Sequence, residues 1–161
     1  MARRLRVFAP GGAYHLTARG VNDGVIFRTT FDCFHLLGLL RDVTKRVGWT
    51  VAAWCFMHTH YHLVVVTGAD PRVSEAMHRL NGIYAREFNV RHHRRGHLFG
   101  DRYAPTPVES DLHLTAACGY VLLNPVTAGI VRRVEDWAWS GGQELEPRAT
   151  ARNGYQLVAK L

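Results

Sequence analysis

The chain has 161 residues, of which 47% are hydrophobic and 20% are charged. This length suits one folded domain, and the composition excludes a disordered or fibrous protein. Twenty Lys and Arg residues against 13 Asp and Glu residues give a formal charge of +7, which favours a polyanionic partner.

No segment is predicted to direct the protein out of the cytoplasm. No apolar run reaches the roughly 18 residues of a membrane span. The basic residues 1–6 are soon followed by residues 10–12 (PGG), before a signal-peptide core can form. The cysteines Cys33, Cys55 and Cys118 lie far apart in apolar sequence, which predicts reduced, buried thiols. We therefore expect a soluble, cytoplasmic protein.

The first 48 residues predict a strand followed by a helix. Residues 13–18 (AYHLTA) are typical of a strand. A helix is expected to begin near Thr29, which precedes Asp32 by three residues, and to end at Gly48. Its apolar residues recur at helical spacing: Leu36, Leu37, Leu40, Val43 and Val47.

Two strands and a second helix follow. Residues 49–57 and 60–67 are rich in aromatic and β-branched residues, which predicts two strands joined by a tight connection. Apolar residues recur at helical spacing from residue 73 to residue 89, and residues 91–96 (RHHRRG) form a basic loop.

The remaining elements are an edge strand and a last helix. Residues 103–108 contain two prolines, which confine a strand there to the edge of a sheet. The last helix is expected to have Ser110 or Asp111 as its cap and to run to residue 123, where the Asn-Pro step at 124–125 stops it.

This order of elements predicts an α+β fold, with helices packed on one face of an antiparallel sheet. No linker or internal repeat divides the chain. We therefore expect one domain over residues 1–141. Periodicity is lost after Gly141, so residues 142–161 are interpreted as a C-terminal extension, loosely packed from residue 143.

Three histidines are candidate metal ligands. His60 and His62 lie two residues apart on a predicted strand, so their side chains project from one face. Two such imidazoles can bind one metal ion, although strand histidines also serve as ordinary hydrogen-bonding groups. His58 is in phase with them if the strand extends backward, which leaves open a three-histidine zinc hydrolase with a water nucleophile.

Tyr120 and Asn124 are candidate functional residues on the last helix. They are spaced i, i+4 and therefore share one flank. Each alone has an ordinary interpretation, as a packing residue and as a helix stop. A neighbouring apolar stripe is expected to anchor this helix to the sheet: Leu112, Ala116, Gly119 and Leu123.

Arginines gather in and after the second helix. We expect them to contact phosphates, with aromatic side chains stacking on unpaired bases, although a solvated face is the alternative. These candidate nucleic-acid-binding residues are Arg79, Arg86, Arg91, Arg94 and Arg95.

Residues 55–65 (CFMHTHYHLVV) and 120–129 (YVLLNPVTAG) resemble the REP-associated tyrosine transposases and the related single-tyrosine insertion-sequence transposases of the histidine-hydrophobic-histidine superfamily. Further landmarks of that family occur in order within residues 3–141: YHLTARG at 14–20, IF at 26–27, FN at 88–89, GHLF at 96–99, RY at 102–103 and WAWS at 137–140. The family usually has Pro-Asn where this chain has His58-Thr59, which leaves the turn geometry and any role of His58 open.

The resemblance implies a ferredoxin-like sheet with the catalytic tyrosine on the last main helix. It implies that His60 and His62 are metal ligands, that Asn124 is a third ligand, and that Tyr120 is the nucleophile. The activity would be that of a metal-dependent single-stranded DNA endonuclease and strand transferase. Its substrate would be hairpin-forming palindromic DNA, joined to the protein through a 5′ phosphate. Mg²⁺ prefers oxygen ligands, whereas imidazole ligation also suits Mn²⁺, and we expect either ion to serve.

Other functions stay open beside this one. The chain can be a noncatalytic nucleic-acid-binding module that keeps the fold but no longer cuts, or the three-histidine zinc hydrolase. We expect a monomer or a homodimer, with no membrane and no protein partner required.

Overall fold

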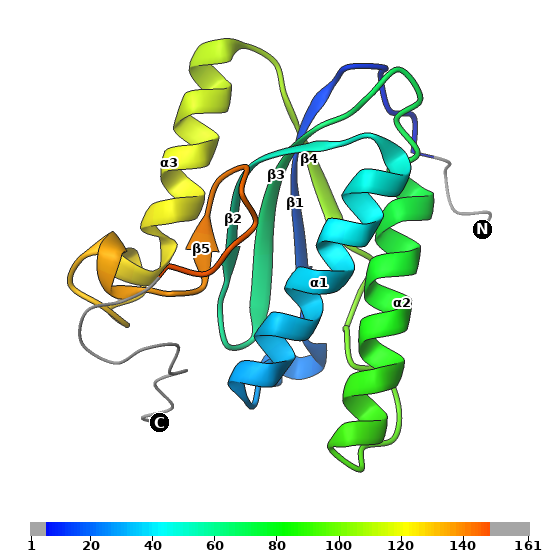
Figure 1. The fold of residues 1–161 in the computed structure, drawn as a ribbon, viewed down its shortest axis with the longest axis vertical. Coiled ribbons are helices and arrows are strands. Elements are labelled where there is room, and N and C mark those ends of the chain that lie inside the picture. The colour runs from blue at the N-terminus through cyan, green and yellow to red at the C-terminus, as the bar shows by residue number, and fades with distance from the viewer. Residues whose placement is uncertain (1–5, 149–161) are drawn as a thin grey trace.

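A computed structural model describes residues 6–148, which form a five-stranded antiparallel sheet with three α-helices (Figure 1). The strands lie side by side in the order β4-β1-β3-β2-β5. The elements along the chain are β1 (Ala13–Arg19), α1 (Thr30–Val47), β2 (Thr50–Phe56), β3 (His60–Val66), α2 (Val73–Arg91), β4 (Ala104–Val108), α3 (Asp111–Thr127) and β5 (Ser140–Gly141), with short 3-10 helices at Val21–Asp23 and Val134–Asp136.

The first six of these α and β elements have the β-α-β-β-α-β order of a ferredoxin-like fold. The α+β class and the ferredoxin-like sheet expected from the sequence are therefore confirmed. The proline-containing strand β4 lies at a sheet edge, as predicted. The two-residue strand β5, which pairs with β2 at the opposite edge, was not expected because it is too short to show alternation.

Local sequence explains where α1 begins and ends. The Thr29 hydroxyl accepts a hydrogen bond from the Asp32 backbone N–H, and the Asp32 carboxylate accepts one from the Thr29 backbone N–H, which is a capping box. Gly48 ends the helix in the left-handed conformation, with φ of 69°. Both ends agree with the sequence prediction.

The last helix runs past the Asn-Pro step that was expected to stop it. Of the two expected caps, Ser110 is the one that caps its start, by accepting a hydrogen bond from the His113 backbone N–H, but α3 continues to Thr127 with Pro125 inside. Pro125 is buried, so packing outweighs the one backbone hydrogen bond that a proline removes near a helix end. Asn124 is consequently a helical residue.

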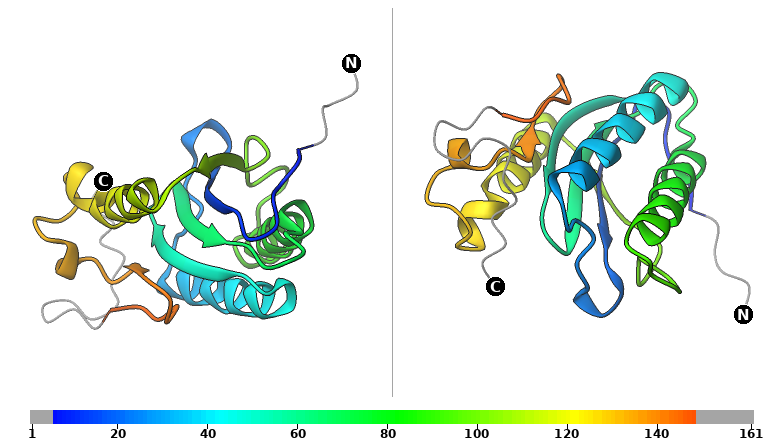
Figure 2. Two further views of the ribbon diagram at one scale, coloured as in Figure 1. Left: turned by 90° about the horizontal axis from the view of Figure 1, so that it is seen from above. Right: turned by 60° about the horizontal axis from the view of Figure 1, so that its bottom comes forward.

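The helices divide between the two faces of the sheet (Figure 2). On one face, the Tyr61 side chain of β3 reaches α2, where its hydroxyl donates to Oδ1 of Asn81. Alternation places His62 on the other face, where its ring contacts Tyr120 of α3. The expectation of helices on one face therefore describes α1 and α2, whereas α3 lies against the opposite face.

The stripe that anchors α3 differs from the predicted one. Leu112 is 81% exposed and Leu123 is 49% exposed, so neither anchors the helix. The buried residues are Ala117, Val121 and Pro125, which are spaced four apart and therefore lie on one flank. Nearly every position of this helix is apolar or small, so periodicity alone could not select the buried flank.

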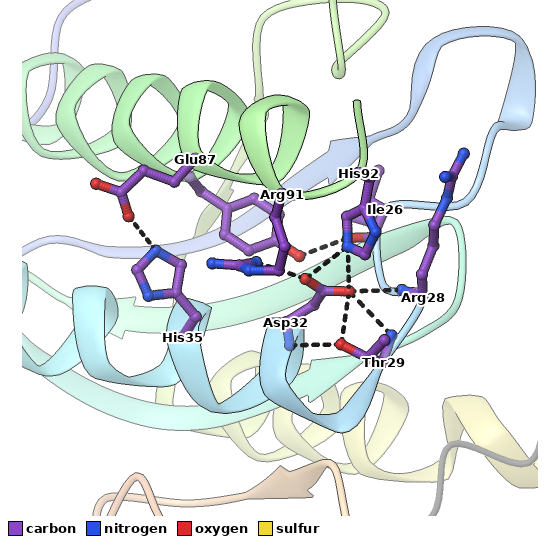
Figure 3. Close-up of polar contacts among 9 residues, drawn as sticks. Ile26, Arg28, Thr29, Asp32, His35, Glu87, Arg91 and His92 are labelled. Carbon is purple, nitrogen blue, oxygen red and sulfur yellow. Dashed lines mark hydrogen bonds and ion pairs between the residues drawn. The ribbon is translucent and has the colours of Figure 1, made fainter. Parts of the chain in front are cut away.

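A buried carboxylate joins α1 to the C-terminal end of α2 (Figure 3). The fully buried Asp32 receives hydrogen bonds from Arg91 Nη1 (2.6 Å) and His92 Nε2 (2.9 Å). The backbone N–H groups of Arg28 and Thr29 donate to the same carboxylate, each at 2.9 Å. Burial alone would raise the pKa of Asp32, but these hydrogen bonds together hold the pKa below its ordinary value. We call these five residues the Asp32 cluster.

The described part of the C-terminal extension packs on the domain. Leu145 is buried, and its carbonyl accepts hydrogen bonds from Nε and Nη2 of Arg41. The Arg148 backbone N–H donates to the Ala138 carbonyl. The expected loose packing therefore does not hold for these residues, while residues 149–161 lie outside the described part. In the described part, no helix has the length and apolar character needed to cross a membrane.

Candidate active site

The two histidines of β3 lie together on the face that α3 crosses. His60 and His62 alternate with the fully buried Tyr61, and their ring centroids are 4.9 Å apart. His62 is itself buried, while His60 is partly exposed. The strand thus presents two imidazoles at the boundary between the sheet and solvent, as the spacing predicted.

Neighbouring side chains engage Nδ1 of each imidazole. Nδ1 of His62 lies 2.9 Å from Nε2 of His15 and 3.2 Å from Oγ1 of Thr17. Nδ1 of His60 lies 3.1 Å from Oγ1 of Thr59. A histidine whose Nδ1 is held in this way is oriented to offer Nε2 to a ligand, as in many protein metal sites.

The register of β1 against β3 produces these contacts. Thr17 is paired with His62, and His15 precedes Thr17 by two residues on the same strand. Residues 15 and 17 therefore face the same side as the histidine pair. His15 and Thr17 were not among the residues predicted from the sequence, although the YHLT segment carries both at alternate positions. The missing information was which strand pairs with β3, and in which register.

Both histidines of the pair are neutral at physiological pH. Burial lowers the pKa of His60 to about 4, and the Arg19 cation adds to this effect. Burial lowers the pKa of His62 to about 3, with further contributions from His60, His15 and Arg19. Burial also lowers the pKa of His15. Neutral imidazole is the form that binds a metal ion.

Helix α3 brings Tyr120 and Asn124 to the pair. The Tyr120 ring lies edge-on to His62 at 5.9 Å and to His15 at 5.8 Å between centroids. The Asn124 amide nitrogen lies 3.4 Å from Nε2 of His62. Tyr120 is nevertheless 55% exposed, so it borders the histidines and solvent together. The continuation of α3 through Pro125 is what keeps these two residues on one helical flank.

This donor set fits a divalent cation. A half-turn of the Asn124 amide exchanges its nitrogen and oxygen, which would direct an oxygen toward Nε2 of His62. Two neutral imidazoles and one amide oxygen leave further coordination positions for water and phosphate oxygens. Among residues 6–148, no Nε2 hydrogen-bond partner is found for His60, which leaves this atom available to a cation.

The structure does not assemble the three-histidine alternative. The His58 ring packs against Trp137 at 5.8 Å between centroids. Within the described range, no three His, Cys, Asp or Glu side chains gather into a metal-binding group. His58, His60 and His62 are in phase along the sequence, but His58 belongs to the turn before β3, where alternation does not apply.

The five candidate arginines do not surround the histidine pair. All belong to α2 or to the loop that follows it. Arg91 is held in the Asp32 cluster. Arg94 donates to Oδ1 of Asn89, and Arg86 lies 3.6 Å from Glu87. Arg79 and Arg95 are exposed. Phosphate contacts by Arg79, Arg86, Arg94 and Arg95 stay predictions, whereas Arg91 has a structural partner.

Cations closer to the pair were not among the candidates. Arg19 ends β1 directly opposite His60 in the strand register, and its side chain is 53% exposed. Arg102 lines a cavity of about 510 Å³ together with Arg19 and Thr17. Their sequence signal was weak, because single arginines at the ends of strands are common on any soluble surface.

The ferredoxin-like fold, the paired histidines on β3 and the tyrosine on α3 together define a class of proteins. Comparisons with known proteins identify the family within that class. The family model described as "Transposase IS200 like" matches residues 11–123. The chain therefore belongs to the IS200-like transposase family. No curated protein sequence matches the chain.

Two solved structures share the fold. One is a REP-associated tyrosine transposase bound to a REP hairpin, with TM-score 0.69 and 19% identity, covering 87% of this chain and 82% of that chain. The other is a putative transposase from Deinococcus radiodurans, with TM-score 0.51 and 19% identity, covering 76% of this chain and 96% of that chain. These similarities extend the resemblance found in the sequence to the fold.

Proposed function

We propose that the protein is a metal-dependent single-stranded DNA endonuclease and strand transferase that uses Tyr120 as its nucleophile. The observation that carries this proposal is the convergence of α3 on β3: Tyr120 packs edge-on against His62, and Asn124 approaches Nε2 of the same histidine. A tyrosine that only packs the core would be buried, whereas Tyr120 is 55% exposed.

His60, His62 and Asn124 would hold the cation. A bound Mg²⁺ or Mn²⁺ ion would act as a Lewis acid toward the phosphodiester. His15 and Thr17 would hold His62 with its proton on Nδ1, because that proton can be donated to Nε2 of His15. The lone pair of His62 Nε2 would then face the site.

The Tyr120 hydroxyl would lose its proton to solvent, and its oxygen would form the new bond to phosphorus. The bond from phosphorus to the 3′ oxygen of the neighbouring deoxyribose would break, and that oxygen would take up a proton. The products would be a 5′-phosphotyrosine and a free 3′ hydroxyl. Because the tyrosyl ester keeps the phosphodiester energy, a second 3′ hydroxyl can reverse the step, which gives strand transfer without a nucleotide cofactor.

Hairpin-forming DNA is the proposed substrate. The similar structure of a REP-associated tyrosine transposase has a REP hairpin bound, and the formal charge of +7 on this chain suits a polyanion. The exposed Tyr120 beside the histidine pair suits an unpaired strand, whose phosphates are accessible from more directions than those of a duplex.

A cleavage assay in which the divalent metal is varied or removed tests this proposal. A labelled hairpin with unpaired flanks would be incubated with the protein in Mg²⁺, in Mn²⁺ and in excess chelator. We expect cleavage and a detergent-resistant protein–DNA complex in either metal and neither product in chelator. DNA binding with no cleavage in any divalent metal would instead identify a noncatalytic binding module.

A further inference from the structure

A long groove lies along α2, on the side of the sheet away from α3. Its volume is about 850 Å³, which is within the range of about 300–1,000 Å³ typical of ligand sites. One wall is the flank of α2 from Ser74 to Asn89, and the other is the segment 96–103 that leads to β4. We call it the α2 groove. His60, His62, Tyr120 and Asn124 do not line it.

A second cavity connects the α2 groove with the candidate active site. This cavity of about 510 Å³ is lined by Thr17 and Arg19, and Thr17 contacts His62. The two cavities share three lining residues, Gly100, Asp101 and Arg102. A strand that leaves the histidine pair beside Thr17 can therefore pass Arg102 and enter the α2 groove.

The side chains of the α2 groove suit unpaired nucleotides. Arg86 and Arg102 supply cations for phosphates, and the exposed His97 supplies a ring on which a base can stack. Phe99, which packs against Tyr61 and Tyr84, adds a partly buried apolar surface to the groove. Asn81 adds an amide, whose Oδ1 is already engaged by Tyr61. Polar and aromatic groups beside a few cations are the combination found in single-strand grooves rather than in duplex clamps.

Two carboxylates also line the α2 groove. Glu75 lies at its end and is within 4.0 Å of the Arg46 and Arg72 guanidinium groups, so its charge is balanced. Asp101 belongs to the wall shared by the two cavities. Because the groove carries these two carboxylates beside Arg86 and Arg102, its binding of DNA should depend less on salt than a phosphate clamp would.

We propose that the unpaired DNA strand next to the scissile phosphate passes Arg102 and lies in the α2 groove. This inference rests on the proposed function, since it places more of the same substrate. It also gives Arg86 of α2 a role, although α2 and the histidine pair lie on opposite faces of the sheet.

Gly82 offers a way to fill the groove without disturbing the fold. It lines the groove in the middle of α2, and a Cβ added there would meet no atom within 4 Å. Glutamate is a better helix former than glycine, so Gly82→Glu should not destabilise α2. The new carboxylate would occupy the groove and pair with Arg86 four residues later. Gly38 of α1 is the matched control, because its Cβ would also meet no atom within 4 Å and it does not line the groove.

The test compares two DNA molecules, in Ca²⁺ to limit turnover. One is a hairpin with five unpaired nucleotides on each side, and the other is the same hairpin without them. We expect Gly82→Glu to weaken binding of the flanked hairpin about tenfold and to leave binding of the unflanked hairpin unchanged. Gly82→Ala should lie within twofold of the wild type, as should Gly38→Glu, and thermal unfolding should confirm that all variants fold.

Three results would overturn the inference. Equal affinity of Gly82→Glu and the wild type for the flanked hairpin would show that the strand lies elsewhere, while metal-dependent cleavage by the wild type would leave the proposed function intact. Equal weakening by Gly82→Glu and Gly38→Glu would show a nonspecific effect of added negative charge. A wild-type chain that binds neither DNA would reject the proposed function and this inference together.

Discussion

Two histidine-containing polar clusters lie on opposite sides of the sheet, and they differ in what remains available. In the Asp32 cluster, the carboxylate is fully buried and receives hydrogen bonds from side chains and backbone alike. Around His60 and His62, neighbours engage Nδ1 of each ring, Asn124 approaches Nε2 of His62, and the exposed Tyr120 borders the pair. The Asp32 carboxylate is satisfied within the protein, whereas the histidine pair reaches solvent at His60 and beside Tyr120. This difference separates a structural cluster from a candidate active site more clearly than histidine content does.

The sharpest test of this comparison removes the hydroxyl oxygen of Tyr120, beside the histidine pair. Tyr120→Phe should reduce hairpin cleavage to background, because the variant lacks the proposed nucleophile. Stability and hairpin affinity should stay near wild type, since the ring is retained and is 55% exposed. Cleavage rates, binding titrations and thermal unfolding measure the three quantities. Undiminished cleavage would remove Tyr120 from the mechanism.

Removal of either histidine of the pair should be almost as damaging. His60→Ala or His62→Ala should abolish metal-dependent cleavage, and the double variant should lose little more, because ligands of one ion act as a unit. His58→Ala should have a milder effect, since the His58 ring packs against Trp137 instead. Metal titrations and cleavage rates would check the series. An effect of His58→Ala equal to that of His60→Ala, with zinc retained in the wild type, would favour the three-histidine hydrolase.

A substitution in the Asp32 cluster should change the stability of the protein but not its cleavage rate. Asp32→Asn should lower the free energy of unfolding by about 3 kcal/mol, because Arg91 and His92 lose their buried partner. Cleavage per folded molecule should be unchanged. Denaturant titrations and rates normalised to the folded fraction would check both. A loss of cleavage in folded Asp32→Asn would place this cluster in the active site.

The same cluster predicts a pH dependence. The pKa of Asp32 is lower in the folded protein than its ordinary value of about 3.9. The stabilisation is therefore fully present above that ordinary value and is lost as pH falls through the lower, folded pKa. As the pH falls below 5, the wild type should lose more stability than Asp32→Asn. Parallel curves for the two proteins would contradict this assignment.

His15 should affect metal binding by the histidine pair through its contact with His62. His15→Phe removes the nearer of two acceptors for Nδ1 of His62, leaving Oγ1 of Thr17, and should weaken Mn²⁺ binding about 10-fold. His15→Gln keeps an acceptor and should recover part of the affinity, which a packing role alone would not predict. Electron paramagnetic resonance titration of Mn²⁺ measures this directly, without DNA. Equal Mn²⁺ affinity in His15→Phe and the wild type would exclude the positioning role.

The smallest expected effect concerns the basic loop after α2. Arg94→Ala with Arg95→Ala should make the log–log dependence of hairpin affinity on salt shallower by about 1.4, since each lost single-strand phosphate contact removes about 0.7. Binding should weaken for all DNA sequences alike. Titrations at several salt concentrations, with Tyr120→Phe as the control of unchanged slope, would show this. A wild-type slope in the double variant would leave these arginines as a solvated face.

Most of the fold followed from local sequence signals. The capping residues Thr29 and Ser110 and the left-handed Gly48 placed helix ends correctly, because capping depends on neighbours along the chain. The stop at Asn124 and the buried stripe of α3 were wrong for a common reason. Both depend on how α3 packs against β2 and β3. The sequence of a helix made mostly of apolar or small residues does not indicate that packing.

The candidate site was predictable in part. The His60–His62 spacing and the Tyr120–Asn124 spacing each placed two side chains on one face of an element. Which elements meet was known only from a resemblance. His15 required the pairing of β1 with β3, and the interior role of Arg91 required the packing of α1 against α2. Charge alone could not separate an arginine that holds Asp32 from one that faces solvent.

The central claim is tested most directly by the mass of the protein after reaction. The wild type would be incubated with a hairpin and Mn²⁺, quenched, and analysed intact and after proteolysis. We predict a mass increase equal to one DNA fragment, attached through its 5′ phosphate to the peptide that contains Tyr120, with a free 3′ hydroxyl on the other fragment. Cleaved DNA without any adduct, or an adduct on another residue, would contradict the account.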